Sequence, residues 1–187
     1  MEPDEDLLVR AAREPSAFEP LVDRHSVALH GYLVRRAPTA ADDLLSEVWL
    51  QAYATRHTYD VTRGPARGWL FGVARNVLAR HWQTVSRATG GPKPPLETSD
   101  DDPWQAVDQR LDATAMGSEL RRRLAELPES ERELLLLVAW EQLTPTEAAA
   151  VVGIPPGTAR SRLHRARNRL RDGLSGTNLT KLTGDFA

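Results

Sequence analysis

Six arginines and no acidic residue lie between Gly157 and Arg171, a density of positive charge that few other stretches of this chain approach. The planar guanidinium of arginine can bond guanine O6 and N7 together, or clasp a phosphate. The spacing predicts a helix over this range with Ser161, His164, Arg165 and Asn168 on its polar face. A solvated, arginine-rich surface helix is the simpler alternative. The flanking signals described next favour contact with DNA.

The residues before this segment predict a second helix and a tight turn, which together make a helix-turn-helix. Thr144 and Glu147 have the spacing of a capping box, and Pro145 occupies a first helical position. Gly153 can supply the positive φ that ends the helix. Pro156 stands where a capping Ser or Thr would be usual. The residues expected to pack on the core share one helical face and are Ala159, Leu163, Ala166 and Leu170.

A second basic segment lies in the first half of the chain, where no acid occurs between Val61 and Leu96. The acids gather instead at the N-terminus and between Glu97 and Asp102, so the formal net charge is only −2. Two separate positive surfaces on a nearly neutral chain suggest two contacts with one polyanion.

Composition excludes several classes of protein. The chain has 187 residues, 41% of them hydrophobic, and no cysteine, so a disulfide framework and thiolate metal sites are excluded. We expect no signal peptide, no membrane insertion, a cytoplasmic location, no cofactor and no small-molecule substrate. We also expect no catalytic residues and no metal site, since His25 and His30 do not share a helical face and no Ser/His/Asp set is visible.

The hydrophobic periodicity predicts an all-α fold of two small helical domains joined by a flexible linker. The first domain covers residues 1–86 and the second, with the helix-turn-helix, covers 116–174. Between them, residues 87–115 are rich in Pro and Asp. Residues 175–187 are expected to be a mobile tail.

Three motifs in this order resemble the extracytoplasmic-function sigma factors of bacteria, members of the sigma-70 family. Residues 41–49, ADDLLSEVW, are similar to A-E-D-L-V-Q-E-V-F, and residues 69–76, WLFGVARN, are similar to W-L-x-x-I-A-R-N. Residues 127–133, LPESERE, with residues 157–167, GTARSRLHRAR, are similar to L-P-x-x-x-R-E followed by G-T-V-K-S-R-L-x-R-A-R. The resemblance covers roughly residues 14–85 and 116–172.

The resemblance implies a sigma region 2 bundle that binds polymerase and the −10 element, and a sigma region 4 helix-turn-helix that binds the −35 element. The implied partners are core RNA polymerase (its β′ clamp helices and β flap), promoter DNA and an anti-sigma factor. The implied polymerase-binding residues are Asp42, Asp43, Ser46, Glu47 and Leu50. The implied contacts to single-stranded −10 DNA lie in the 58–67 loop and helix that follows, at Arg63, Arg67, Arg75, Asn76 and Arg80. The implied contacts to duplex −35 DNA are Thr158, Arg160, Ser161, His164 and Arg165.

Two residues depart from the family pattern. Ser46 stands where Gln is usual, which predicts a lost or shortened hydrogen bond to polymerase. Arg80 stands where Asp or Asn is frequent, which predicts an unusual −10 preference. We also consider that the acids from Glu97 to Asp102 screen the basic surfaces when polymerase is absent.

Other interpretations stay open at this point. The helix-turn-helix could belong to a polymerase-independent repressor or activator, or the acidic N-terminal face could belong to a protein-binding adaptor that uses no DNA. The helical spacing of Trp69 and Trp82 favours a place in the core over stacking on a base. For Phe71 the sequence favours neither role. Asn76 favours DNA contact, because an amide offers an unpaired base both a donor and an acceptor.

Overall fold

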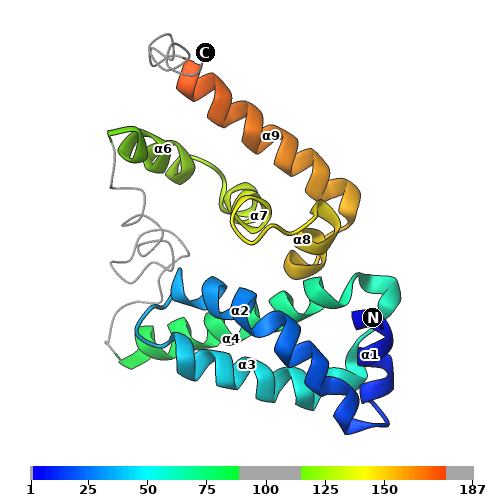
Figure 1. Ribbon diagram of the computed structural model, residues 1–187. Coiled ribbons are helices and arrows are strands. Elements are labelled where there is room, and N and C mark those ends of the chain that lie inside the picture. The colour runs from blue at the N-terminus through cyan, green and yellow to red at the C-terminus, as the bar shows by residue number, and fades with distance from the viewer. Residues whose placement is uncertain (1, 89–114, 176–187) are drawn as a thin grey trace, which may run out of the picture.

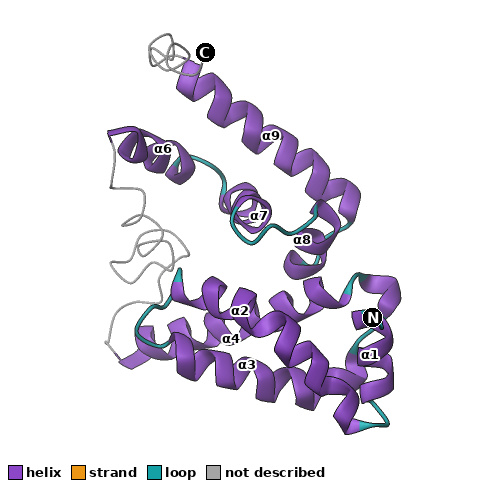
Figure 2. Cartoon of the chain, in the orientation of Figure 1, coloured by secondary structure: helices purple, strands orange, loops and turns teal. Residues whose placement is uncertain are grey.

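The structure, a computed structural model, describes residues 2–88 and 115–175, and every regular element within them is helical (Figures 1 and 2). The predicted all-α fold is therefore confirmed. The first module contains α1 (Asp4–Ala11), α2 (Glu19–Val34), α3 (Ala41–Thr55) and α4 (Ala66–Ala88). The second module contains α6 (Ala115–Ala125), α7 (Glu129–Ala139), α8 (Pro145–Val152) and α9 (Pro156–Ser175). Short 3-10 turns cover Pro15–Phe18, Arg56–Thr58 and Val61–Arg63.

The core of the first module lies between α2, α3 and α4, which pack on one another through their apolar faces. Leu29, Leu33, Val48, Leu70 and Phe71 are completely buried there. Helix α2 ends at Val34, shortly before Pro38, and α4 begins at Ala66, directly after Pro65. Proline lacks the N–H that would continue a preceding helix, so both prolines lie between helices.

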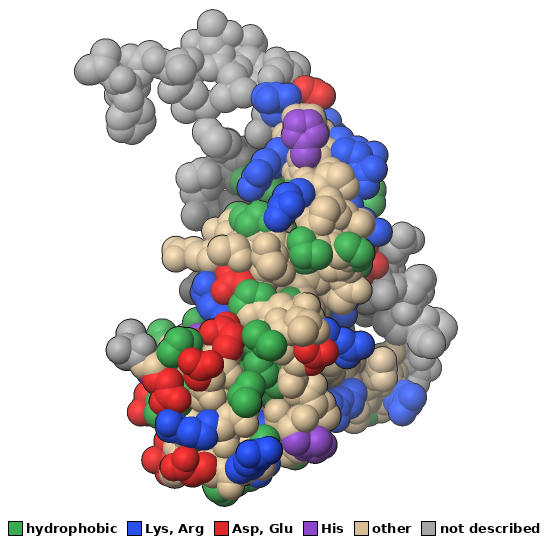
Figure 3. Space-filling model, turned by 90° about the vertical axis from the view of Figure 1, so that its right-hand side faces the viewer, with side chains coloured by type: hydrophobic (Ala, Val, Ile, Leu, Met, Phe, Trp, Pro, Cys, Tyr) green, Lys and Arg blue, Asp and Glu red, His purple; other side chains and the backbone are tan. Residues whose placement is uncertain are grey.

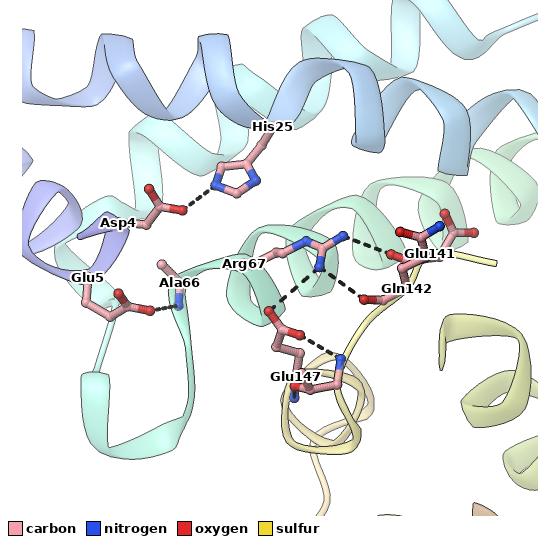
Figure 4. Close-up of polar contacts among 9 residues, drawn as sticks. Asp4, Glu5, His25, Ala66, Arg67, Glu141, Gln142 and Glu147 are labelled. Carbon is pink, nitrogen blue, oxygen red and sulfur yellow. Dashed lines mark hydrogen bonds and ion pairs between the residues drawn. The ribbon is translucent and has the colours of Figure 1, made fainter. Parts of the chain in front are cut away.

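Helix α1 was not predicted from the sequence, and contacts with distant residues hold it in place. His25 Nε2 lies 2.6 Å from Asp4 Oδ2, and Arg24 donates to the other Asp4 oxygen. Glu5 accepts a 3.0 Å hydrogen bond from the N–H of Ala66, the first residue of α4 (Figure 4). Leu7 and Leu8 of α1 are buried against the bundle. An amphipathic helix of this length is marginal by itself, so these tertiary contacts make the helix.

We predict that Asp4 makes the protein sensitive to acid. Burial by itself raises the pKa of Asp4, but hydrogen bonds and charges from Arg24 and His25 outweigh it and hold the pKa below its usual value. A carboxyl whose pKa is lower when folded contributes stability above its unfolded pKa and loses it as the pH falls through the folded one. Asp4→Asn should therefore flatten the fall in unfolding free energy as the pH is lowered through about 4. Urea unfolding measured across this range checks the prediction.

The matched control is Asp23→Asn, which removes an exposed acid of α2 and should leave the acid dependence unchanged. An Asp4→Asn protein that loses stability with acid as steeply as the parent would contradict the prediction.

The second module differs from the expected boundaries at its last helix. Helix α9 extends to Ser175, beyond the expected end at Arg171. In the first module, α4 extends to Ala88, two residues past residue 86, where the first domain was expected to end. Pro156 is the first residue of α9, where proline is well tolerated, so it does not occupy the capping position assumed from the sequence. Most of the predicted linker, residues 89–114, lies outside the described residues. So does the predicted tail, apart from Ser175.

The two modules contact each other through α4 and α8, which lie side by side in Figure 1. One hydrophobic cluster runs from the first module into the second and includes Leu70, Leu137, Val151 and Leu163. A Cβ atom added to Gly68 of α4 would lie 2.9 Å from the Glu147 carbonyl oxygen and 3.1 Å from Ala150 Cβ. Only glycine allows the helices to approach this closely at that point.

Candidate nucleic-acid interface

The helix-turn-helix forms as its sequence predicts, with each end of α8 satisfied by local hydrogen bonds. Thr144 Oγ1 accepts from the Glu147 N–H at 3.2 Å, and the Thr144 N–H donates to Glu147 Oε2 at 2.7 Å. Gly153 has φ +75°, and its N–H donates to the Ala149 carbonyl. This left-handed turn sends the chain directly into α9, so the capping box, Pro145 and Gly153 are confirmed.

Packing of α9 fixes which of its side chains face solvent. Ala159, Leu163 and Ala166 are buried along the predicted apolar face of α9, which we call its seam, and Leu170 packs against the same side. Because a helix presents its opposite face to solvent, Arg160, Ser161, His164 and Arg165 are exposed, and Thr158 is half-buried beside them. The structure therefore brings the predicted −35 residues to the accessible side of one helix. In the face shown by Figure 3, Lys and Arg side chains cluster on the second module.

A buried acid beneath this face was missed by sequence reasoning. Glu131 of α7 has only 6% of its side chain exposed and pairs with two arginines of α9. Its Oε1 lies 3.2 Å from Arg165 Nε, and its Oε2 accepts from Arg169 at 3.1 Å. The spacing of residues along the chain does not reveal this contact, because the crossing of α7 over α9 creates it.

The residues predicted to contact −10 DNA divide into two groups. Arg63, Asn76 and Arg80 are exposed. Arg63 stands on an ordered turn, since Asp60 Oδ1 accepts hydrogen bonds from the Thr62 N–H and hydroxyl. The other two, Arg67 and Arg75, point instead toward the second module, an arrangement that the sequence did not predict.

Arg67 and Arg75 are held by oxygens of the second module. Arg67 donates to the Glu141 carbonyl at 2.8 Å and to the Gln142 carbonyl at 3.2 Å (Figure 4). Arg75 donates from Nε and Nη2 to the two oxygens of Glu133, at 2.5 Å and 3.1 Å. The hydrogen bonds and charge of Glu133 raise the pKa of Arg75 further, against the lowering effect of its burial.

The predicted polymerase-binding residues form an exposed strip along α3. Asp42, Asp43, Ser46, Glu47 and Leu50 all face solvent, and 73% of the Leu50 surface is exposed. An exposed leucine flanked by acids suits a partner helix that offers both an apolar and a basic surface. The Ser46 hydroxyl donates to the Asp42 carbonyl at 3.2 Å, so this short side chain is directed back along its own helix.

The aromatic candidates for base stacking belong to the core to different degrees. Phe71 is completely buried and meets Tyr32 edge-on, with the ring centroids 5.6 Å apart. Trp69 and Trp82 are partly buried against the core, and Trp69 also meets Tyr59 edge-on. In this conformation Phe71 cannot stack on a base.

Residues 2–88 and 115–175 contain no cluster of three or more His, Cys, Asp or Glu side chains arranged to hold a metal ion. His25 contacts Asp4, whereas His30 contacts Asp42 on a different element. None of the helices described is both long and apolar enough to cross a lipid bilayer.

Family models match both modules of the chain. Residues 21–88 match sigma-70 region 2, and residues 118–170 match sigma-70 region 4. The chain is 36% identical over 134 residues to the ECF RNA polymerase sigma factor SigC of Mycobacterium tuberculosis, covering 70% of this chain and 68% of the relative. It is 30% identical over 178 residues to the ECF RNA polymerase sigma factor SigL of the same species, covering 91% of this chain and 96% of the relative.

Two solved structures share the fold. The structure of CnrH in complex with the cytosolic domain of CnrY superposes with a TM-score of 0.61, at 24% identity, over 95% of this chain and all of that one. The sigma factor RpoE of Bartonella quintana, solved with the anti-sigma factor NepR, gives a TM-score of 0.55 at 21% identity over 86% of this chain and 98% of that one.

Proposed function

Since the chain belongs to the extracytoplasmic-function sigma factors of the sigma-70 family, which direct transcription initiation, we propose how its own residues divide that task. The exposed strip on α3 binds core RNA polymerase, at the β′ clamp helices. The second module binds the −35 element as duplex and contacts the β flap. The first module captures the −10 element as a single strand. The protein contributes specificity to polymerase and has no catalytic site of its own.

The arrangement of α8 and α9 carries this proposal. A capped α8 and a left-handed Gly153 fix the angle at which α9 leaves the turn. The buried seam then leaves a row of hydrogen-bonding side chains on the opposite face, where a major groove can receive them. Ser161 donates to the Thr158 carbonyl at 2.9 Å, which leaves its oxygen lone pairs free to accept from an amino group of a base.

Melting of the −10 element needs a site that prefers separated strands to duplex. Capture of an unstacked base supplies this preference, at a cost of about a few kcal/mol for unstacking. The exposed amide of Asn76, next to Arg80 on the surface of α4, offers such a base both a donor and an acceptor. By the same family logic we expect a cytoplasmic site of action and an anti-sigma factor as a partner.

Run-off transcription with purified core polymerase and a genomic pool of promoter fragments tests the proposal. The protein should direct new transcript starts that share two sequence elements. A protein that binds duplex DNA but never starts a transcript with any fragment would instead be a polymerase-independent regulator.

Arg165→Ala should weaken binding to the preferred −35 duplex by about 1–3 kcal/mol, because the guanidinium contacts the edge of one base. The loss should be seen as reduced discrimination at that one base pair. Fluorescence titration against duplexes substituted at each position measures this effect. The matched control is Arg167→Ala, which removes another exposed arginine of α9 and should weaken all sequences alike. Equal weakening by Arg165→Ala across all duplexes would show that Arg165 contacts only phosphate.

Asn76→Ala should leave −35 duplex binding unchanged yet impair formation of the open complex, because the amide acts only on an unpaired base. Permanganate reactivity of −10 thymines in the polymerase complex reports strand opening. Gln83→Ala removes the same amide from an exposed position further along α4 and serves as the control. Parent-level reactivity in the Asn76→Ala complex would contradict the proposed role.

A further inference from the structure

Several of the side chains that the proposed function assigns to the −35 duplex have a partner within the protein. Ser161 donates to the Thr158 carbonyl of its own helix. His164 Nε2 lies 2.9 Å from Asn168 Nδ2, one turn further along α9. Both contacts join exposed groups, so water competes for them. Arg165 differs from these residues, because its partner is a buried carboxylate that comes from α7.

The carboxylate belongs to Glu131, which lies in the first turn of α7, where that helix meets α9. The Glu131 N–H donates to the Pro128 carbonyl at 2.8 Å, so the backbone is fixed at this point. Ala166, the neighbour of Arg165 in α9, is completely buried in the same cluster as Leu127. Since only 6% of the Glu131 side chain is exposed, this acid supports an arginine and does not itself meet DNA.

The ion pair leaves the end of the Arg165 guanidinium available. Glu131 Oε1 lies 3.2 Å from Arg165 Nε, whereas Oε2 accepts from Arg169. Within residues 2–88 and 115–175, Arg165 has no second polar partner, and 57% of its side chain is exposed. The terminal nitrogens therefore remain for a ligand. Their N–H groups lie in one plane and match the O6 and N7 acceptors of guanine.

An arginine that is already held recognises a base better than a mobile one. A mobile arginine samples many rotamers, and binding must select one of them. Ordering such a side chain lowers affinity by about two- to tenfold. The ion pair with Glu131 orders Arg165 in the folded protein, before DNA arrives. The carboxylate also reduces the local positive charge, which weakens the attraction of nearby phosphates for the same guanidinium.

We propose that Glu131 is a positioning residue for promoter recognition. It holds Arg165 so that the terminal nitrogens of the guanidinium face the major groove and bind a guanine of the −35 duplex. The inference rests on the proposed −35 role of Arg165, and it adds the residue that orients this arginine and the base that the arginine reads.

Sequencing of bound duplexes tests the proposal with the full-length protein. The protein is equilibrated with a pool of randomised duplexes, and the ratio of bound to free molecules gives the discrimination at each position. Arg165→Ala identifies the position that Arg165 reads, because a preference for guanine should be lost there. Glu131→Gln removes the charge of the carboxylate and keeps the size of the side chain. It should lower the guanine preference at that same position by about two- to tenfold and leave the other positions unchanged.

Two further variants separate positioning from a structural link between α7 and α9. Glu129→Gln removes the same charge from the same turn of α7 and should leave every preference unchanged. Arg169→Ala removes the other partner of the carboxylate, so it weakens a structural link but leaves Arg165 in place. The guanine preference should therefore persist in Arg169→Ala. Circular dichroism verifies that each variant is folded.

A second substitution and a double variant complete the test. Glu131→Asp keeps the charge but withdraws the carboxylate from Arg165, so it should cause a similar loss of guanine preference, and it decides the question if Glu131→Gln does not fold. Glu131→Gln combined with Arg165→Ala should lose no more discrimination than Arg165→Ala alone, because Glu131 acts only through this arginine.

The possible failures have different meanings. A preference that Arg165→Ala abolishes but both Glu131 variants leave at parent strength would overturn the inference and leave the −35 assignment intact. Equal losses at all positions in Glu131→Gln, or the same loss in Arg169→Ala, would also overturn it, because both indicate a shift of the whole helix. Loss of a preference for a base other than guanine would overturn the assignment of guanine. If Arg165→Ala changes no preference, Arg165 reads no base, and its −35 assignment fails together with the inference.

Discussion

Replacing Phe71 with alanine should lower the free energy of unfolding by about 3–5 kcal/mol, one of the largest losses we expect from a single substitution. Phe71 is completely buried between α2 and α4, in edge-on contact with Tyr32. Truncation removes its buried area and leaves a cavity that rigid helices cannot fill. Arg67, whose guanidinium lies 5.7 Å from the centre of the Phe71 ring, would also lose part of its support. Urea unfolding followed by circular dichroism measures the loss.

Phe71→Leu separates this structural role from base stacking. Leucine keeps most of the buried volume, so the loss of stability should be well below that of Phe71→Ala. It removes the aromatic ring completely, so a residue that stacks on DNA would lose its contribution to open-complex formation. A Phe71→Leu protein that is stable but fails to open promoters would contradict the assignment of Phe71 to the core.

Replacing Leu163 with alanine should lower the free energy of unfolding by about 2–5 kcal/mol. Leu163 is 1% exposed at the centre of the α9 seam and belongs to the cluster that both modules share. The same seam sets the direction of the exposed arginines, because a helix that shifts on its core moves every side chain of its opposite face. Binding to a −35 duplex should therefore fall even at temperatures where the variant remains folded.

Leu170→Ala is the matched control for Leu163→Ala. Leu170 lies on the same side of α9 but is only partly buried, at the edge of a small separate cluster. Its truncation should cost distinctly less stability and leave duplex binding nearly intact. Equal losses from the two substitutions would show that the seam is uniform and that Leu163 is not its centre.

Features set by residues close together in the chain could be predicted from the sequence. The capping box of Thr144 and Glu147, the turn at Gly153 and the seam of α9 each involve spacings of a few residues. Because their chemistry is local, the residue types and spacings of the second module were enough to predict its helix-turn-helix closely. The strip on α3 was instead implied by the family resemblance, and the structure shows that its residues are exposed.

Features set by distant residues could not be predicted. Helix α1 depends on Asp4 and Glu5 reaching residues about 20 and 60 positions away, at His25 and Ala66. Arg75 and Glu133 are 58 positions apart, and an acid-free stretch gives no sign that an acid arrives from elsewhere. The sequence therefore indicated which arginines suit DNA, and the structure alone shows that two of them already have partners.

The acid beneath α9 has a consequence for how the protein searches a chromosome. Affinity for arbitrary sequences comes mainly from ions released when arginines neutralise phosphates. Glu131 offsets one of the two positive charges of Arg165 and Arg169, so together they displace fewer ions than two free arginines would. The six arginines of the helix should therefore give a shallower salt dependence than their number suggests. We therefore expect short residence on wrong sites, with discrimination set by the geometry of the groove.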